Sequence, residues 1–305
     1  MELYTQRHGM RIPKEKTYTI NVESYKLLFN VCQRYSMNLA WKYPHSCNFC
    51  KKIINLDKEN LDIALKYEIP NLFRRNGNIA IPEATFNFFE DKEEYDEYDQ
   101  YALIDYIEYI AYYCKDYKYS YNDDCEHQYY LFKSSDIEYR NFQKEVNHVF
   151  DMVGLLYFLN DERQIERIVE YTPLTGEIEN NISQIKEDET RKLLQEAIRI
   201  YKSPYPDAPR DAMEKIWDAL ERLKTYYTSL DKKHSIIKIV DDMSNGQKSY
   251  IDLFNIEFKT LTDIGNKFRI RHHETDKVDI TDARYCDYFF NRCLSLIALA
   301  IQYLE

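Results

Sequence analysis

The sequence lacks several features that would each define a class of protein. It contains no apolar run as long as a membrane span, and its N-terminus has no signal-peptide pattern. No segment repeats with a period of roughly 20 to 50 residues, which argues against a solenoid. We therefore expect a soluble, cytoplasmic protein that does not bind a membrane.

Positive charge is also in deficit. The 305-residue chain has a formal net charge of -11, which argues against a protein that coats nucleic acid through a broad basic surface. Local recognition of a phosphate stays open, because salt limits the reach of a charge to roughly 8–10 Å under physiological conditions.

Tryptophan is scarce, with 2 residues against 29 Tyr and 15 Phe. A tyrosine buries its ring but keeps a hydroxyl that needs water or a partner. A chain rich in tyrosine therefore builds amphipathic faces and interfaces as readily as dry interiors.

The length suits one large or two ordinary domains. We predict a mainly α protein with a boundary near residue 180, so that a mostly helical domain with little strand (1–180) precedes a helical bundle (181–305). Asn76-Gly77 predicts a turn, and 117–125 is expected to be a loop. Apolar spacing and capping residues predict helices over 21–42, 56–70, 101–116, 136–160, 187–201, 209–229, 234–244, 248–267 and 282–304.

The seven cysteines are an odd number with mostly irregular spacing, which favours reduced thiols over a disulfide framework. Cys47 and Cys50 alone have the Cys-x-x-Cys spacing that a tetrahedral zinc ion accepts. A second closely spaced pair is missing nearby, so we expect ordinary thiols, no metal and no cofactor. The further ligands that could complete a zinc site are His45, Cys32 and the distant pair Cys125 and His127.

Two acidic groups have plain structural interpretations. Asp123 and Asp124 lie near His127, where a polar turn is favoured over a metal cluster. The Tyr-laced run 90–99 could bind a basic partner or mimic nucleic acid, but such runs more often form the solvated entry to a helix.

The segment 263–277 stands against the acidic average, because it gathers Arg269, Arg271, His272 and His273 between two predicted helices. Side chains at such a junction can point outward from a rigid scaffold. We take these four residues as the candidate centre. The neighbours expected to assist in binding are Asn266, Lys267 and Lys277.

These residue types supply what metal-free cleavage of RNA requires. Arginine offers a planar set of donors that suits a phosphate, and histidine takes or gives a proton near neutral pH. The alternative is that Arg and His only form ion pairs with Glu274, Asp276 and Asp279 at the end of a bundle.

Three phrases resemble HEPN-domain proteins, and within them the AbiJ-like abortive-infection group of prokaryotic defence proteins. They are Arg7-His-Gly9, Ile216-Trp-Asp-Ala-Leu-Glu-Arg-Leu-Lys224 and Phe268-Arg-Ile-Arg-His-His-Glu274. The resemblance implies a C-terminal HEPN-like bundle that cleaves RNA without metal, and an N-terminal regulatory or sensing domain that responds to a phage-derived or protein trigger. It also implies a homodimer through the C-terminal helices, in which paired motifs form one site.

The resemblance implies roles for individual residues. His273 would be the general acid or base and Arg269 the phosphate clamp, with Arg271 and His272 as substitutes and Glu274 orienting an imidazole. Only three residues separate Arg269 from His273, fewer than in the family's Arg-His pattern. This departure leaves open a non-catalytic sensor or adaptor that binds RNA or a nucleotide.

Overall fold

The computed structural model describes residues 4–8, 10, 14–87, 92–170, 172–271 and 274–304. The chain divides into two compact units, Met1–Ile168 and Val169–Glu305. The expected division was at residue 180. A mainly α fold is confirmed, and among the described residues no helix is both long and apolar enough to cross a membrane.

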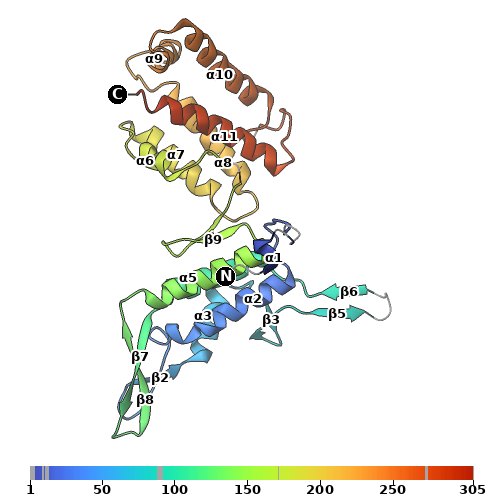
Figure 1. Ribbon diagram of the computed structural model, residues 1–305, viewed down its shortest axis with the longest axis vertical. Coiled ribbons are helices and arrows are strands. Elements are labelled where there is room, and N and C mark those ends of the chain that lie inside the picture. Colours follow the sequence, from blue (N-terminus) through green and yellow to red (C-terminus); the bar gives the residue numbers. More distant parts are fainter. Residues whose placement is uncertain are drawn as a thin grey trace. The chain divides into compact units, whose positions relative to one another are not determined.

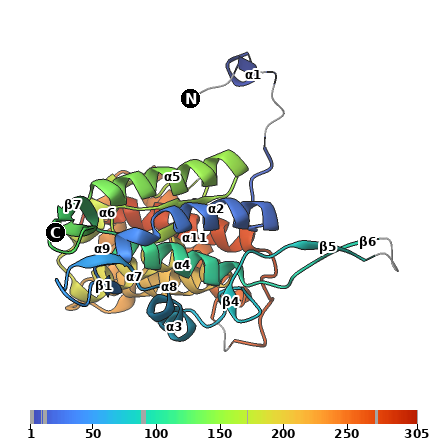
Figure 2. The same ribbon diagram turned by 90° about the horizontal axis from the view of Figure 1, so that it is seen from below.

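The first unit is built around three longer helices, which Figures 1 and 2 show in the blue and green part of the chain. Asn21, Asp57 and Asp99 each cap a helix by accepting a hydrogen bond from a backbone N–H of its first turn. Its helices are α1 (Tyr4–Arg7), α2 (Val22–Arg34), α3 (Lys58–Glu68), α4 (Gln100–Tyr113) and α5 (Ile137–Val153), with a 3₁₀ helix at Ser36–Leu39.

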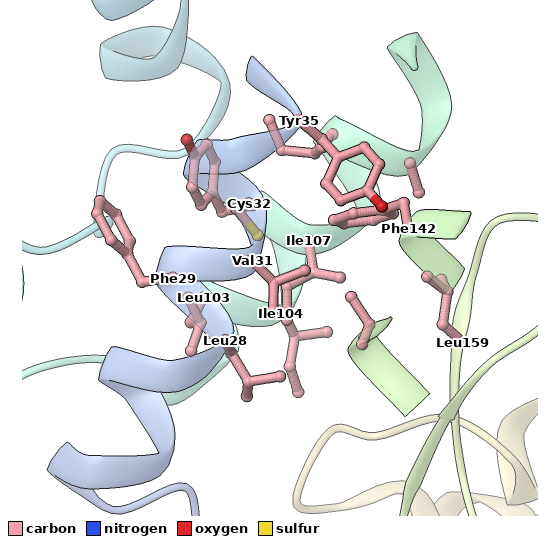
Figure 3. Packing of buried hydrophobic residues seen from close by; sticks show 14 of the residues in the cluster. Leu28, Phe29, Val31, Cys32, Tyr35, Leu103, Ile104, Ile107, Phe142 and Leu159 are labelled. Atoms are coloured by element: carbon pink, nitrogen blue, oxygen red, sulfur yellow. The ribbon is translucent and has the colours of Figure 1, made fainter. Parts of the chain in front are cut away.

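The core of the first unit lies where α2 contacts α4 and α5. Apolar residues at helical spacing on α2 and α4, including Leu28 and Leu103, are fully buried there. Figure 3 shows Leu28 and Leu103 beside Phe29, with Ile104 and Ile107 between them and Phe142 of α5. This core forms the packed centre of the unit, to which the hairpins are attached.

The first unit contains more strand than the sequence predicted. Within the residues that the structure describes, five two-stranded antiparallel sheets pair β1 with β2, β3 with β4, β5 with β6, β7 with β8 and β9 with β10. The strands are Pro44–Ser46, Ile53–Leu56, Arg74–Arg75, Asn78–Ile79, Ala84–Asn87, Lys92–Tyr95, Asp116–Asn122, His127–Lys133, Tyr157–Leu159 and Ile165–Arg167, numbered β1 to β10 in chain order.

The structure tests two predictions for this part of the chain, the turn at Asn76-Gly77 and the loop over 117–125. The predicted turn at Asn76-Gly77 joins β3 to β4, and both residues have positive φ angles, 53° and 83°. The loop expected over 117–125 is wrong, since residues up to Asn122 form β7 and pair with β8. The period-2 alternation of Tyr117, Tyr119 and Tyr121 is the strand signal that was missed.

The helix expected over 136–160 also ends early, at Val153. Gly154 follows with φ 80°, and a Cβ there would lie 2.5 Å from the Glu15 carbonyl oxygen. Glycine is therefore required at this position. The chain then turns into β9.

The regular elements among the described residues of the second unit are all helices, apart from an isolated bridge between Phe268 and Val278. Its helices are α6 (Gly176–Ser183), α7 (Asp188–Tyr201), α8 (Ala208–Leu223), α9 (Lys232–Ser244), α10 (Lys248–Lys267) and α11 (Ala283–Ala300), which form the yellow to red part of Figure 1. Asp231 and Asp282 cap α9 and α11.

Helix α8 is central to the second unit, because it contacts both α7 and α11. Its apolar face, which includes Ile216 and Leu220, is fully buried. Tyr201 of α7 stacks on Phe290 of α11 with ring centroids 3.8 Å apart. The predicted helices of this part therefore pack as a bundle around one core.

Candidate functional site

The basic segment connects α10 to α11, and we call residues 266–277, which include the last two residues of α10, the basic loop. Two backbone hydrogen bonds close its base: Arg269 N–H donates to Val278 O (2.8 Å), and Val278 N–H donates to Lys267 O (3.1 Å). Ile270 is almost fully buried. The sequence thus fixes both ends of the loop on the bundle.

Helix α8 contacts both the end of α10 and the basic loop. Gly265, in the last turn of α10, lies so close to Trp217 that a Cβ would be 2.3 Å from the indole Nε1. The next residue of α8, Asp218, accepts hydrogen bonds from Arg271 Nη2 (2.7 Å) and Nε (3.3 Å). Two of the phrases that resemble HEPN proteins are therefore in contact.

Three described cations of the loop, Arg269, Arg271 and Lys277, have carboxylate partners. Arg269 lies 3.8 Å from Asp279, which also pairs with Arg210 at 2.5 Å. Lys277 donates to Glu274 Oε1 and to the Gly265 carbonyl, both at 2.8 Å. The loop is consequently less positive than its sequence alone implies.

The ionisation of these groups follows from the same contacts. The hydrogen bond to Asp218 raises the pKa of Arg271 above its usual range. Burial opposes ionisation of Glu274, but hydrogen bonds from Lys277 and from the Arg271 backbone outweigh it and lower the Glu274 pKa. Donation from Arg210 lowers the pKa of Asp279. The loop therefore holds fixed charges of both signs at neutral pH.

Of the remaining candidates, Asn266 and Lys267 lie within the described residues and the two histidines do not. Asn266 and Lys267 are exposed at the C-terminal end of α10, where the helix dipole disfavours anions unless a cation such as Lys267 compensates. His272 and His273 lie outside the described residues, as do Gly9 and the side chain of Arg7.

An aromatic hollow of about 540 Å³ lies beside the loop. Tyr285 and Tyr288 are 60% and 55% exposed on its rim, while Phe268 and Phe289 contact each other with ring centroids 5.5 Å apart. No sequence pattern singled out this hollow, because its rings come from the loop and from the start of α11. The lining residues are Phe268, Val278, Asp279, Ile280, Thr281, Tyr285, Tyr288 and Phe289.

The apolar C-terminal part of α11 packs inside the second unit. Leu294, Leu296 and Ile297 are buried within the second unit itself. The bundle therefore accounts for this apolar stretch. An exposed apolar face lies on α10 instead, where Tyr250, Leu253 and Ile256 are about half exposed or more.

A second group of chemically active side chains lies in the first unit. Cys47, Cys50, Cys125 and His127 place one ligand atom each within 4.8 Å of the others. The first two come from the turn between β1 and β2. Cys125 comes from the turn between β7 and β8, and His127 is the first residue of β8, directly after that turn. Figure 1 shows β2 beside β7 and β8. The distant pair considered from the sequence thus joins the Cys-x-x-Cys motif.

The other suggested zinc ligands are not in this group. Cys32 is buried in the core on α2 and His45 is exposed on β1. Asp123 and Asp124 are exposed in the β7–β8 turn. Within the described residues, only the three thiols and one imidazole converge.

The thiols of the cluster differ in acidity. Hydrogen bonds, the largest of them from the Cys50 backbone N–H, lower the pKa of Cys47 to about 6. Burial, followed by the neighbouring Cys50, raises the pKa of Cys125 to about 11. The cluster therefore favours a thiolate at Cys47 at neutral pH, while Cys125 stays protonated unless a cation joins it.

The acidic run falls largely outside the described part of the chain. Residues 88–91 and the side chains of the flanking strands are not described.

No family model, curated protein or solved structure matches the chain.

Proposed function

We propose that the chain is an abortive-infection protein of the HEPN class whose second unit is a metal-independent endoribonuclease. The observation that carries this proposal is the position of the aromatic hollow beside the basic loop. Single-stranded RNA is typically recognised through cations that contact its phosphates and flat rings that stack on its bases. Both kinds of group lie at the α10–α11 junction, since Phe268 lines the hollow and Arg269 follows it directly in the sequence.

The proposed reaction uses the chain's own side chains. His273 acts as general base or acid for attack of the ribose 2′-oxygen on the adjacent phosphorus and for departure of the 5′-oxygen, with His272 as its substitute. Arg269 and Arg271 stabilise the charge that develops on the phosphate. Glu274 carries a lowered pKa, so it is an ionised carboxylate suited to orienting an imidazole. Asn266, Lys267 and Lys277 hold the neighbouring RNA.

The proposal includes a homodimer. Because carboxylates offset the cations of one loop, a single copy attracts an anion weakly, and two copies would double the number of arginines and histidines at the site. The exposed apolar side chains Tyr250, Leu253 and Ile256 of α10 offer a surface for such a contact.

A second function is favoured by a specific observation. Arg271 is engaged by Asp218 at 2.7 Å, and Arg269 and His273 are more closely spaced than in the family pattern. Both facts favour a sensor or adaptor that binds RNA or a nucleotide without cleaving it.

The two functions separate in one experiment. The double variant His272→Ala/His273→Ala should lose RNA cleavage without added magnesium and lose toxicity on expression, while its circular dichroism stays unchanged. His148→Ala, which changes an exposed histidine of the first unit, is the control. A double variant that still cleaves RNA would refute the assigned roles. Saturable RNA binding without turnover by the unaltered chain would select the second function.

A further inference from the structure

We propose that Cys47, Cys50, Cys125 and His127 bind one structural zinc ion that joins the β1–β2 hairpin to the β7–β8 hairpin. This inference is independent of the RNA chemistry proposed for the second unit. It rests on the convergence of four ligand atoms from two turns that are far apart in the sequence.

The distances suit a tetrahedral zinc ion. With Zn–S bonds of about 2.3 Å and Zn–N bonds of about 2.0–2.1 Å, tetrahedral ligands lie roughly 3.8 Å apart for two sulfurs and roughly 3.5 Å apart for sulfur and nitrogen. Cys50 Sγ and His127 Nε2 are 3.5 Å apart, and all four ligand atoms lie within 4.8 Å of one another. Small movements would complete the coordination shell.

The histidine is oriented for this role. Its Nδ1 lies 3.2 Å from the Gln128 carbonyl oxygen. A carbonyl can only accept, so Nδ1 must carry the proton in this hydrogen bond, and Nε2 is left with the lone pair that a metal requires. Hydrogen bonding of the second ring nitrogen in this way is the usual arrangement of a metal-binding histidine.

The turns that present the ligands are themselves specified. Cys47 N–H donates to Lys52 O and Lys51 N–H donates to Cys47 O, which folds the Cys-x-x-Cys segment back on itself with Lys51 at φ 58°. In the other turn, Asn122 Oδ1 accepts from the Cys125 backbone N–H at 3.2 Å. Local hydrogen bonds thus hold the thiols before any metal binds.

The ligand set indicates zinc and a structural role. Three thiolates and one imidazole favour zinc over harder cations such as Mg²⁺ or Ca²⁺. Four protein ligands fill a tetrahedral shell and leave no position for a substrate or a reactive water. The site therefore supports the fold and does not carry out catalysis.

The hairpins need such support. Isolated two-stranded hairpins are marginally stable in water, and the strands β1 and β2 contain only 3 and 4 residues. Phe49, at the tip of the first turn, is 90% exposed, so the turn has no apolar core of its own. A zinc ion would supply the missing cross-link, since metal binding of this kind contributes directly to folding.

Metal analysis of the full-length chain, purified without added metal or chelator, tests the proposal. We expect about one zinc ion per chain, lost in Cys47→Ser and in Cys125→Ser. His45→Ala, on the same hairpin, and Cys286→Ala, which removes a thiol elsewhere, should both retain zinc. Retention by Cys125→Ser, or a metal content well below one in the unaltered chain, would overturn the site.

A second measurement covers the case in which the cysteine variants fail to fold. The unaltered chain, freed of zinc and supplied with Co²⁺ under reducing conditions, should show the absorption of tetrahedral cobalt with thiolate ligands. A spectrum of octahedral cobalt would overturn the proposal. So would iron in place of zinc, or a Cys47–Cys50 disulfide in the protein as isolated.

Discussion

Trp217 and Gly265 are in such close contact that the indole occupies the space where any larger residue would place its Cβ. The position would lie 2.3 Å from Nε1 and 2.9 Å from Cε2, both shorter than a van der Waals contact. This contact brings α8 against the last turn of α10, directly before the basic loop. It also places Asp218 where it can bind Arg271.

Replacing Gly265 by alanine should therefore destabilise the second unit. Alanine is the better helix former by about 1 kcal/mol, but forcing a methyl group into a packed interface typically costs about 1–3 kcal/mol. We expect a net loss of stability, measured by urea unfolding. In a Trp41→Phe background the fluorescence of Trp217 reports the second unit alone, because the chain has only 2 Trp.

Gly176→Ala is the matched control. Gly176 begins α6, and an added Cβ there would have no heavy atom within 4 Å. This variant should be neutral or slightly more stable, by up to about 1 kcal/mol. Equal destabilisation of both variants would show that the Trp217 contact is not the cause.

Asp218 should restrain the affinity of the basic loop for RNA. Asp218→Asn removes the carboxylate next to Arg271 and should tighten binding by about 1 kcal/mol, roughly fivefold in Kd, at low salt. Arg271→Ala should weaken binding, and both effects should shrink as salt is added. Fluorescence anisotropy with a labelled single-stranded RNA measures the two changes.

The control for Asp218→Asn is Glu189→Gln, which also removes one negative charge, here from an exposed ion pair on α7. It should leave the Kd nearly unchanged. If Asp218→Asn weakens binding as much as Arg271→Ala, the ion pair acts only by holding the loop in shape.

The sequence predicted the second unit better than the first. Between residues 187 and 304 the helices are long and amphipathic, with prolines between α7 and α8 and Asn245 between α9 and α10, so local signals and tertiary packing agree. In the first unit the shortest strands, such as β3 and β4 with 2 residues each, carry little periodic signal. The 7-residue strand β7 differs, because its alternating tyrosines do indicate a strand where a loop is expected over 117–125. Packing between segments that are distant in the sequence decides such strands.

The same distinction applies to the sites. Cys47 and Cys50 were found by their spacing, but Cys125 and His127 join them only because β2 lies against β8. The partner of Arg271, Asp218, lies 53 positions away in the sequence, whereas the predicted partners Glu274 and Asp279 are close in sequence. Long-range contacts of this kind leave no trace in local spacing.

The aromatic hollow supplies a third prediction. Tyr288→Ala and Tyr285→Ala should each weaken binding of single-stranded RNA, by about 1–3 kcal/mol where a base stacks on the ring. Tyr303→Ala is the control, because this tyrosine of the second unit is also partly exposed but lies outside the hollow. Anisotropy titrations at fixed salt measure the effect, and equal affinities for all three variants would remove the hollow from the binding site.

Glu187 should make the stability of the second unit depend on pH. Its carboxylate accepts hydrogen bonds from Arg222 Nη2 (2.6 Å) and from the Thr190 backbone N–H (2.7 Å). The bond from Arg222 is the main reason that its pKa is lowered to about 2. The folded state therefore binds this proton less readily than the unfolded chain, whose glutamate pKa is about 4.3.

The sign of the effect follows from this difference. The stabilisation is fully present above about pH 4.3 and is lost as the pH falls toward 2. Because Arg222 is partly exposed, we expect the Glu187 carboxylate to stabilise the second unit by about 1–2 kcal/mol at pH 7.

Glu187→Gln should lose this amount at pH 7 in urea unfolding followed by Trp217 fluorescence. The gap between variant and parent should narrow below pH 4.3, whereas Glu189→Gln, on the same helix, should differ from the parent by less than about 0.5 kcal/mol throughout. A gap for Glu187→Gln that is independent of pH would show that the carboxylate acts through shape alone and not through its charge.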